Sequence, residues 1–147
     1  MARPLHVERT ITTPAARPRV FAWLSDFRTT EAWDPGTIRT TLLSGNGGVG
    51  TVYANESRFA GRTVRLEYVV TELVPDELIV LRGEGPSVVT HDRMSLRDLS
   101  KGGTELVYSA RFAFSGTAGL VSPLLRPLLR RIGDETAARL RETLSNL

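Results

Sequence analysis

The chain has no cysteine among its 147 residues and only two histidines, His6 and His91. The lack of cysteine excludes disulfides, thiolate zinc sites and cysteine nucleophiles. Two histidines are too few for a multi-histidine metal site, and neither has the spacing from carboxylates that a mixed site would need. We therefore predict that the protein has no metal centre and no cofactor.

Long apolar runs are also missing. No stretch approaches the roughly 18 apolar residues that a membrane-spanning helix requires. The segment from Met1 to Val7 lacks the apolar core of a signal peptide. These two absences favour a cytoplasmic protein without a transmembrane segment.

Lysine is nearly absent, because 18 of the 19 basic residues are arginine, and the net charge is +3. The arginines are scattered, whereas a nucleic-acid binder would concentrate them on one face among aromatic residues. Nucleic acid is therefore not an expected partner. The densest group, Arg126, Arg130 and Arg131, has two interpretations. It is either a solvated helix face or a basic surface for peripheral contact with an anionic membrane or partner.

The last thirty residues carry a helical pattern of leucine and isoleucine. A helix of that length would span roughly 45 Å, too long to be enclosed in a domain of this size unless other elements wrap around it. Ser122-Pro123 is typical of a helix start, whereas Pro127 interrupts the apolar pattern and predicts a kink. We expect a lead-in segment near residues 118–126 and a long helix from Pro127 to Ser145.

Upstream of this helix, short segments of alternating apolar residues predict seven strands. They cover residues 5–12, 38–44, 51–59, 63–73, 78–83, 88–96 and 105–114, with short helices at 17–24 and 26–33. The glycine-rich segment 45–50 lacks the Gly-Lys-Ser/Thr of a phosphate-binding loop and is interpreted as a hairpin connection. Strands grouped apart from helices predict one antiparallel α+β domain over residues 1–147.

Cross-strand pairing predicts which side chains share the inner face of this sheet. A type II′ turn at Gly61-Arg62 would pair Phe59 with Val64. Arg9 lies on the same face of its strand as apolar neighbours. The remaining polar residues predicted to face inward are Tyr53, Asn55, Ser57, Tyr68, Thr90, Asp92 and Tyr108.

The order of elements, with the segments VERTITTPAARPRVFAWLSDFRTTEAWDPG, GRTVRLEYVVTELVPDELIVLRG and GGTELVYSARFAFSG, resembles the START/Bet v 1-like superfamily, SRPBCC or polyketide cyclase/dehydrase group. The resemblance covers essentially the whole chain. It implies a helix-grip fold, in which a curved seven-stranded antiparallel sheet encloses an apolar cavity against the C-terminal helix. Members include lipid carriers, receptors, aromatase/cyclases and cochaperones without a shared catalytic motif, so the fold does not settle the function.

Within such a cavity, a buried arginine–carboxylate pair between Arg9 and Asp92 could hold a polar ligand head. Alternatively, Arg9 reaches solvent at the sheet edge and Asp92 accepts from backbone donors. Catalytic residues are not identified, and Asp92, Arg9 and Tyr108 are the candidates. The residues predicted to bind ligand are Trp33, Tyr53, Asn55, Phe59, Tyr68, Thr90, Asp92, Met94, Tyr108, Phe112, Leu124 and Leu128.

Three functions remain open at this point. The first is binding or carriage of a small hydrophobic molecule, such as a lipid, a polyketide or another aromatic compound. The second is an aromatase/cyclase-like or dehydrase enzyme, which would need an inward acid or base with a shifted pKa. The third is a protein-interaction module, which would have a filled cavity and an exposed apolar patch. The chain could be a monomer or a homodimer.

Overall fold

The computed structural model describes residues 4–147. The strands are β1 (Leu5–Thr13), β2 (Thr37–Ser44), β3 (Val52–Phe59), β4 (Arg62–Val74), β5 (Leu78–Glu84), β6 (Val88–Asp98) and β7 (Thr104–Phe114). The helical segments are α1 (Arg17–Ser25), the 3-10 turn η1 (Phe27–Thr29), α2 (Thr30–Trp33), α3 (Gly116–Val121), the 3-10 turn η2 (Ser122–Leu125) and α4 (Arg126–Ser145). The predicted order of strands and helices is confirmed.

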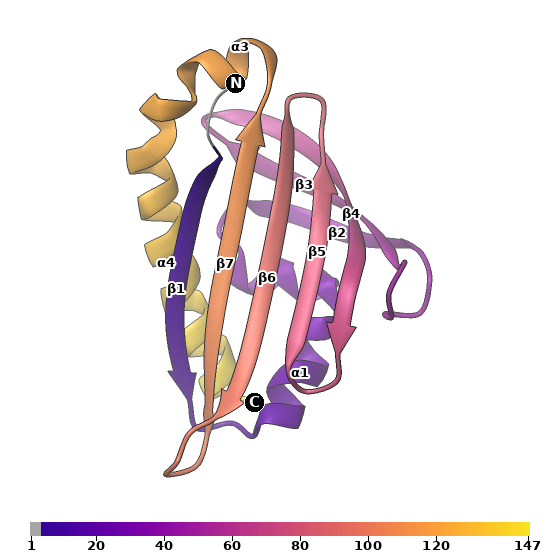
Figure 1. Cartoon of the computed structure of the whole chain (residues 1–147), viewed down its shortest axis with the longest axis vertical. Coiled ribbons are helices and arrows are strands. Elements are labelled where there is room, and N and C mark those ends of the chain that lie inside the picture. Colours follow the sequence, from indigo (N-terminus) through magenta and orange to yellow (C-terminus); the bar gives the residue numbers. More distant parts are fainter. Residues whose placement is uncertain (1–3) are drawn as a thin grey trace.

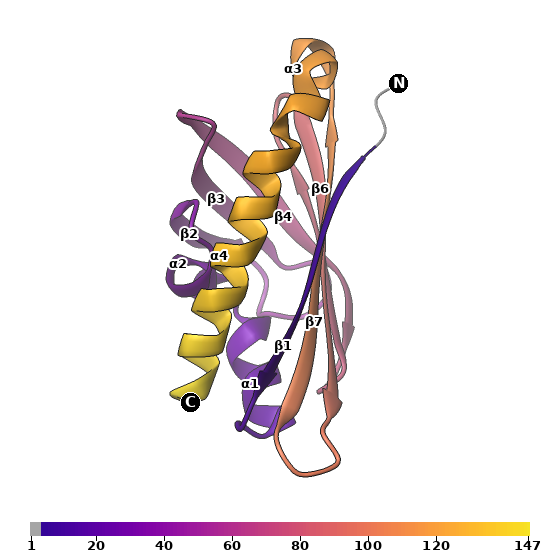
Figure 2. The same ribbon diagram turned by 90° about the vertical axis from the view of Figure 1, so that its left-hand side faces the viewer.

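The strands form one antiparallel sheet in the order β1-β7-β6-β5-β4-β3-β2. The sheet curls, so that β2 and β3 pass behind β5 and β6 (Figure 1). Helix α4 runs along the inner side of this curl, next to β1 (Figure 2). This arrangement is the predicted helix-grip architecture.

One end of the space between sheet and helix is filled by apolar side chains. The short elements α1, η1 and α2 close this end, and Asp26 helps to place them because its carboxylate accepts a hydrogen bond from the Arg28 amide at 3.0 Å. The C-terminal half of α4 packs there through Leu140 and Leu144. The other buried residues of this cluster include Ile11, Leu24, Phe27, Trp33, Tyr53, Met94 and Leu106. We call this region the closed end.

The β3–β4 hairpin differs from the prediction by two residues. Phe59 pairs with Arg62, and not with Val64. The turn residues are Ala60 and Gly61, whose φ angles of 51° and 78° are those of a type I′ turn, not type II′. A two-residue shift leaves each side chain on its predicted face, because side chains alternate with a period of two.

The long C-terminal helix begins at Arg126, close to the expected Pro127. Pro127 lies in its first turn, where a missing N–H costs no hydrogen bond, so the predicted kink at this residue is wrong. The break occurs earlier, at η2, and α3 precedes it. None of the helices within residues 4–147 is both long and apolar enough to cross a membrane.

Candidate functional site: a cavity between the sheet and the C-terminal helix

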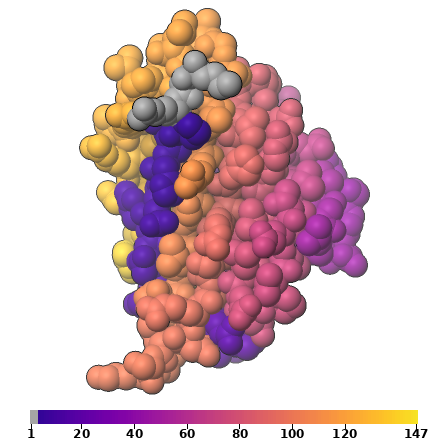
Figure 3. All heavy atoms as spheres, in the orientation of Figure 1, coloured from indigo at the N-terminus to yellow at the C-terminus, as the bar shows by residue number. Residues whose placement is uncertain are grey.

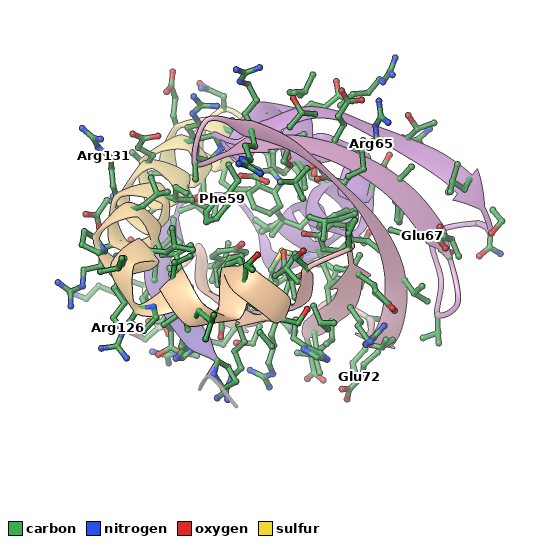
Figure 4. All side chains as sticks on the ribbon, turned by 90° about the horizontal axis from the view of Figure 1, so that it is seen from above. Phe59, Arg65, Glu67, Glu72, Arg126 and Arg131 are labelled. Carbon is green, nitrogen blue, oxygen red and sulfur yellow. The ribbon has the colours of Figure 1, made fainter. Side chains whose placement is uncertain are left out.

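A cavity of about 730 Å³ occupies the end of the fold opposite to α1. Its rim is formed by the β3–β4 turn, the β5–β6 loop and α3, which come together at one end of the molecule (Figure 4). Phe59 points into this space from the tip of the β3–β4 hairpin (Figure 4). The apolar wall includes Val7, Phe59, Val64, Leu66, Val88, Ala110, Phe112, Phe114, Val121, Leu125, Leu129 and Ile132. We call this region the open end.

The opposite side of the sheet offers no comparable entrance. In the space-filling view, side chains of β1, β7, β6 and β5 form a continuous surface over the outer face (Figure 3). The rim at α3 and the β3–β4 turn is the part of the cavity lining that includes exposed residues such as Ala60 and Thr117.

Small residues preserve the volume of the cavity. Ala110 of β7 and Gly133 of α4 both line the cavity, one from the sheet and one from the helix. A Cβ atom on Gly133 would lie 2.6 Å from Val7 Cγ1 and 3.0 Å from Arg9 Nη2. Glycine here lets α4 approach β1 closely, so that the helix covers the cavity.

Polar side chains gather on β6 at the inner part of this wall. Thr90 and Asp92 are two residues apart on the same face, and their side chains are 2% and 5% exposed. The Thr90 hydroxyl has no hydrogen-bond partner among the described residues. Tyr68 from β4 and Tyr108 from β7 border the same group. We call Tyr68, Thr90, Asp92 and Tyr108 the polar wall.

Gly83 of β5 explains how Tyr68 reaches this group. In the sheet, Gly83 stands between Tyr68 on one side and Thr90 on the other. A Cβ atom at Gly83 would lie 2.5 Å from Thr90 Oγ1 and 2.7 Å from Tyr68 Cε1. The tyrosine ring therefore lies across the strand where a side chain is missing. Sequence analysis missed this role, although a glycine inside a strand is a signal of close approach by another group.

Asp34 brings a second carboxylate to the cavity. It follows α2 and begins the Asp-Pro-Gly turn, in which its two oxygens accept from the Gly36 amide at 3.2 Å and from the Thr37 hydroxyl at 2.7 Å. These bonds fix the side chain, and both Asp34 and Gly36 line the cavity. The sequence analysis did not select Asp34, and the ligand-binding residue predicted in this region was its neighbour Trp33.

Burial controls the ionisation of these groups. Desolvation and, to a smaller extent, the charge of Asp34 raise the pKa of Asp92 to about 7, although the Tyr108 hydroxyl acts in the opposite direction. Burial also raises the pKa of Asp34, although its bonds to Thr37 and Gly36 oppose the shift. The pKa values of Tyr68 and Tyr108 lie well above the usual range, chiefly because both rings are buried. Asp92 thus changes charge near neutral pH while both tyrosines stay protonated.

The predicted pair of Arg9 with Asp92 is not formed. Arg9 donates to Asp134 of α4 at 3.1 Å and to the carbonyl oxygen of Arg130 at 3.2 Å. The prediction that Arg9 faces inward was correct. However, α4 lies over β1 there, and its Asp134 supplies the carboxylate that Arg9 contacts. Asp92 consequently has no basic partner within the described part of the chain.

The predicted ligand-binding residues separate into two groups. Phe59, Tyr68, Thr90, Asp92, Tyr108 and Phe112 line the cavity. The prediction that the other six line the cavity is wrong. These residues are Trp33, Tyr53, Asn55, Met94, Leu124 and Leu128.

The reasons for these six corrections are local. Trp33, Tyr53 and Met94 are at most 2% exposed because they fill the closed end. Asn55 donates to Thr40 Oγ1 at 2.9 Å and belongs to a hydrogen-bonded group between β2 and β3. Leu124 is 79% exposed because η2 turns it outward. Leu128 is half-buried beside the cavity.

Two other predictions concern surface charge and metal. Arg126 and Arg131 point away from the cavity into solvent (Figure 4), so a solvated helix face accounts for them, and membrane contact stays a prediction. Within residues 4–147, no group of three or more histidine, aspartate or glutamate side chains is placed to hold a metal ion.

The fold agrees with comparisons to known proteins. The family model described as "Polyketide cyclase / dehydrase and lipid transport" matches residues 4–145. The chain belongs to this family, which is part of the SRPBCC, START-like group predicted from the sequence. No curated protein matches the chain significantly.

Solved structures show the same architecture at low identity. The ZhuI aromatase/cyclase from a Streptomyces species has a TM-score of 0.76 and 21% identity, covering 98% of this chain and 93% of that one. A START superfamily protein from Mycobacterium smegmatis has a TM-score of 0.72 and 18% identity, covering 96% and 94%. The di-domain ARO/CYC BexL from the BE-7585A biosynthetic pathway has a TM-score of 0.73 and 13% identity, covering 96% of this chain and 50% of that one. At these identities the likeness shows the fold alone.

Proposed function

We propose that the protein binds one small hydrophobic molecule in the cavity at the open end, with a polar group of that molecule against the polar wall. The observation that carries the proposal is the cavity itself, about 730 Å³ between an apolar sheet face and α4. This size is within the range of roughly 300–1,000 Å³ that accommodates drug-sized ligands. An apolar wall with a few placed polar groups favours a ligand with an aromatic or aliphatic body.

A cavity of this size weighs against a role limited to protein interaction, because such a role needs no internal space. Exposed apolar side chains do occur on α3 and η2, where Leu120 and Leu124 are 83% and 79% exposed. They lie on the segment that also lines the cavity through Thr117, Ala118 and Leu125, so their exposure does not by itself indicate a protein partner.

An enzyme of the aromatase/cyclase or dehydrase kind is the second candidate, and one specific observation favours it. Asp92 faces the cavity with a pKa of about 7. A carboxylate in this state is able to accept a proton from an activated carbon near neutral pH, while the protonated Tyr68 and Tyr108 donate to a carbonyl or enolate oxygen. His6 and His91 are both exposed, so neither is placed for this work.

The binding proposal is tested by filling the cavity. Ala110→Phe places a ring in the open end, whereas Ala113→Phe places the same ring on the outer, exposed face of the same strand. The neutral fluorescent probe N-phenylnaphthylamine should bind the wild type and Ala113→Phe alike, and should bind Ala110→Phe at least about tenfold more weakly. Thermal unfolding of each variant checks that the fold persists. Equal binding by the wild type and a folded Ala110→Phe would contradict the proposal.

A further inference from the structure

The polar wall has the composition of a site for a positively charged group. Asp92 and Asp34 both line the cavity, and no basic side chain of the described residues forms an ion pair with either. Arg9 is engaged by Asp134, and the arginines that line the cavity, Arg58, Arg62 and Arg65, are exposed. Asp92 and Asp34 therefore share the cavity without a basic side chain of the described residues in ion-pair contact, although the charge of Arg139 acts on Asp34.

Thr90 provides an observation that is independent of these charges. Its hydroxyl is buried in the wall of the cavity and has no partner among the described residues. Buried hydroxyl groups nearly always form hydrogen bonds, and leaving one unpaired destabilises the folded state. Elsewhere in the fold buried threonines are paired, as Thr30 and Thr40 are at 2.6 Å. The Thr90 hydroxyl lies close enough to Tyr68 to affect the pKa of that tyrosine, but it forms no hydrogen bond of good geometry. It is therefore open to a polar group supplied from outside the chain.

We propose that the ligand is an amphiphilic amine, whose protonated amino group lies between Asp92 and Thr90 while its aromatic or alicyclic body fills the apolar part of the cavity. The inference rests on the proposed binding function and names the chemical class of the ligand. An ammonium group has three donors and no acceptor. It suits Asp92 and Asp34, which in ionised form only accept, and the Thr90 hydroxyl, which accepts as readily as it donates.

The surroundings of Asp92 determine how such binding depends on pH. Asp34 faces it from the α2–β2 turn, Tyr108 from β7, and Tyr68 from β4 across Thr90. Arg139 of α4 exerts a weak opposite effect on Asp34. Because Asp92 has a pKa of about 7 without ligand, a cation should bind more tightly as pH rises from about 5 to about 8, where the carboxylate is charged.

The test compares three compounds that share one aromatic body. Naphthylethylamine carries the ammonium group, propylnaphthalene replaces it with a methyl group of similar size, and naphthylpropanone offers a hydrogen-bond acceptor. The affinity of each compound is measured by its displacement of N-phenylnaphthylamine from the wild-type protein and from the variants Asp92→Asn and Thr90→Val. At pH about 8 the amine should bind the wild type most tightly.

The variants separate charge from shape. Asp92→Asn should weaken binding of the amine by about tenfold or more and change the affinity for propylnaphthalene by less than about twofold. Thr90→Val should weaken binding of the amine by roughly threefold. Tighter binding of the ketone than of the amine, or an amine affinity that Asp92→Asn leaves unchanged, overturns the inference while the binding proposal stands. Failure of the fluorescent probe to bind the wild type at all would overturn both.

Discussion

The two ends of the space between sheet and helix are built from the same strands and the same long helix, yet only one is filled. At the closed end, Phe27, Trp33 and Tyr53 insert large rings from η1, α2 and β3, respectively. At the open end the covering element is α3 with η2, which contributes no fully buried large side chain. The cavity thus results from the elements that close each end, because β6, β7 and α4 contribute apolar residues to both.

Buried polar groups differ in the same way. At the closed end, Thr30, Thr40 and Asn55 form a connected group of hydrogen bonds of 2.6 and 2.9 Å. At the open end, the buried Thr90 hydroxyl has no hydrogen-bond partner among the described residues. The buried Asp92 carboxylate has the Tyr108 hydroxyl beside it but forms no ion pair within residues 4–147. A fully paired group contributes to stability, whereas an unpaired one costs free energy. The difference indicates that the closed end is built for stability and the open end for a ligand.

Removing a ring from each end should produce the largest contrast. Trp33→Ala leaves a hole in the closed end and should lower the free energy of unfolding by about 3–5 kcal/mol. Phe112→Ala removes a half-buried ring that already borders empty space, so we expect a loss of less than about 2 kcal/mol. Chemical denaturation of both variants measures the difference. Equal losses would show that the open end is packed as tightly as the closed end.

The ionisation of Asp92 should make the open end sensitive to pH. Its pKa is about 7 in the folded protein, against about 4 in an unfolded chain. The folded state therefore holds the proton of Asp92 more tightly than the unfolded chain does. Asp92 consequently does not alter the free energy of unfolding with pH below about 4, and it lowers that free energy as pH rises from about 4 to about 7.

Asp92→Asn removes this dependence. The free energy of unfolding of the variant should exceed that of the wild type by on the order of 2–4 kcal/mol at pH about 8, and by little at pH about 4. Melting temperatures of both proteins across this range give the measurement. The pKa of Asp34 is also raised, and Asp34 and Asp92 repel each other when both are charged. The difference between the two proteins therefore reports the burial of Asp92 together with this repulsion. A stability difference that stays constant with pH would show that Asp92 ionises normally.

The alternation of residues along strands predicted the inner face of the sheet, because side-chain direction follows from the period of two. Tyr68, Thr90, Asp92 and Tyr108 accordingly point inward as expected. The hairpin register was wrong by two residues, since Ala60 adopts a positive φ that its sequence does not favour. That error did not affect which residues face inward.

What the sequence could not give is the distance between inward residues and the elements that cover them. Trp33 and Met94 were predicted to line a cavity that they in fact help to close. The partner of Arg9 depends on where α4 crosses β1, which a single strand pattern does not contain. The role of Gly83 likewise appears only when Tyr68 and Thr90 are seen on either side of it.

Replacing one buried hydroxyl at each end tests whether buried polar groups are paired at the closed end and unpaired at the open end. The expected changes in the free energy of unfolding are the smallest of those predicted. Thr40→Val keeps the shape of the side chain but leaves the Thr30 hydroxyl and the Asn55 amide with fewer partners. We expect a loss of about 1–3 kcal/mol. Thr90→Val removes a hydroxyl without a partner in the described structure, so stability should stay the same or rise by up to about 1 kcal/mol.

Denaturant unfolding of the two variants in parallel measures this contrast, and unchanged m-values confirm that the same surface is exposed on unfolding. Because both substitutions exchange the same two side chains, intrinsic strand preference cancels between them. A loss at Thr90 as large as that at Thr40 would mean that the Thr90 hydroxyl is already satisfied, for instance by a trapped water molecule. The open end would then be as complete in its polar contacts as the closed end, and Thr90 would not be available to a ligand.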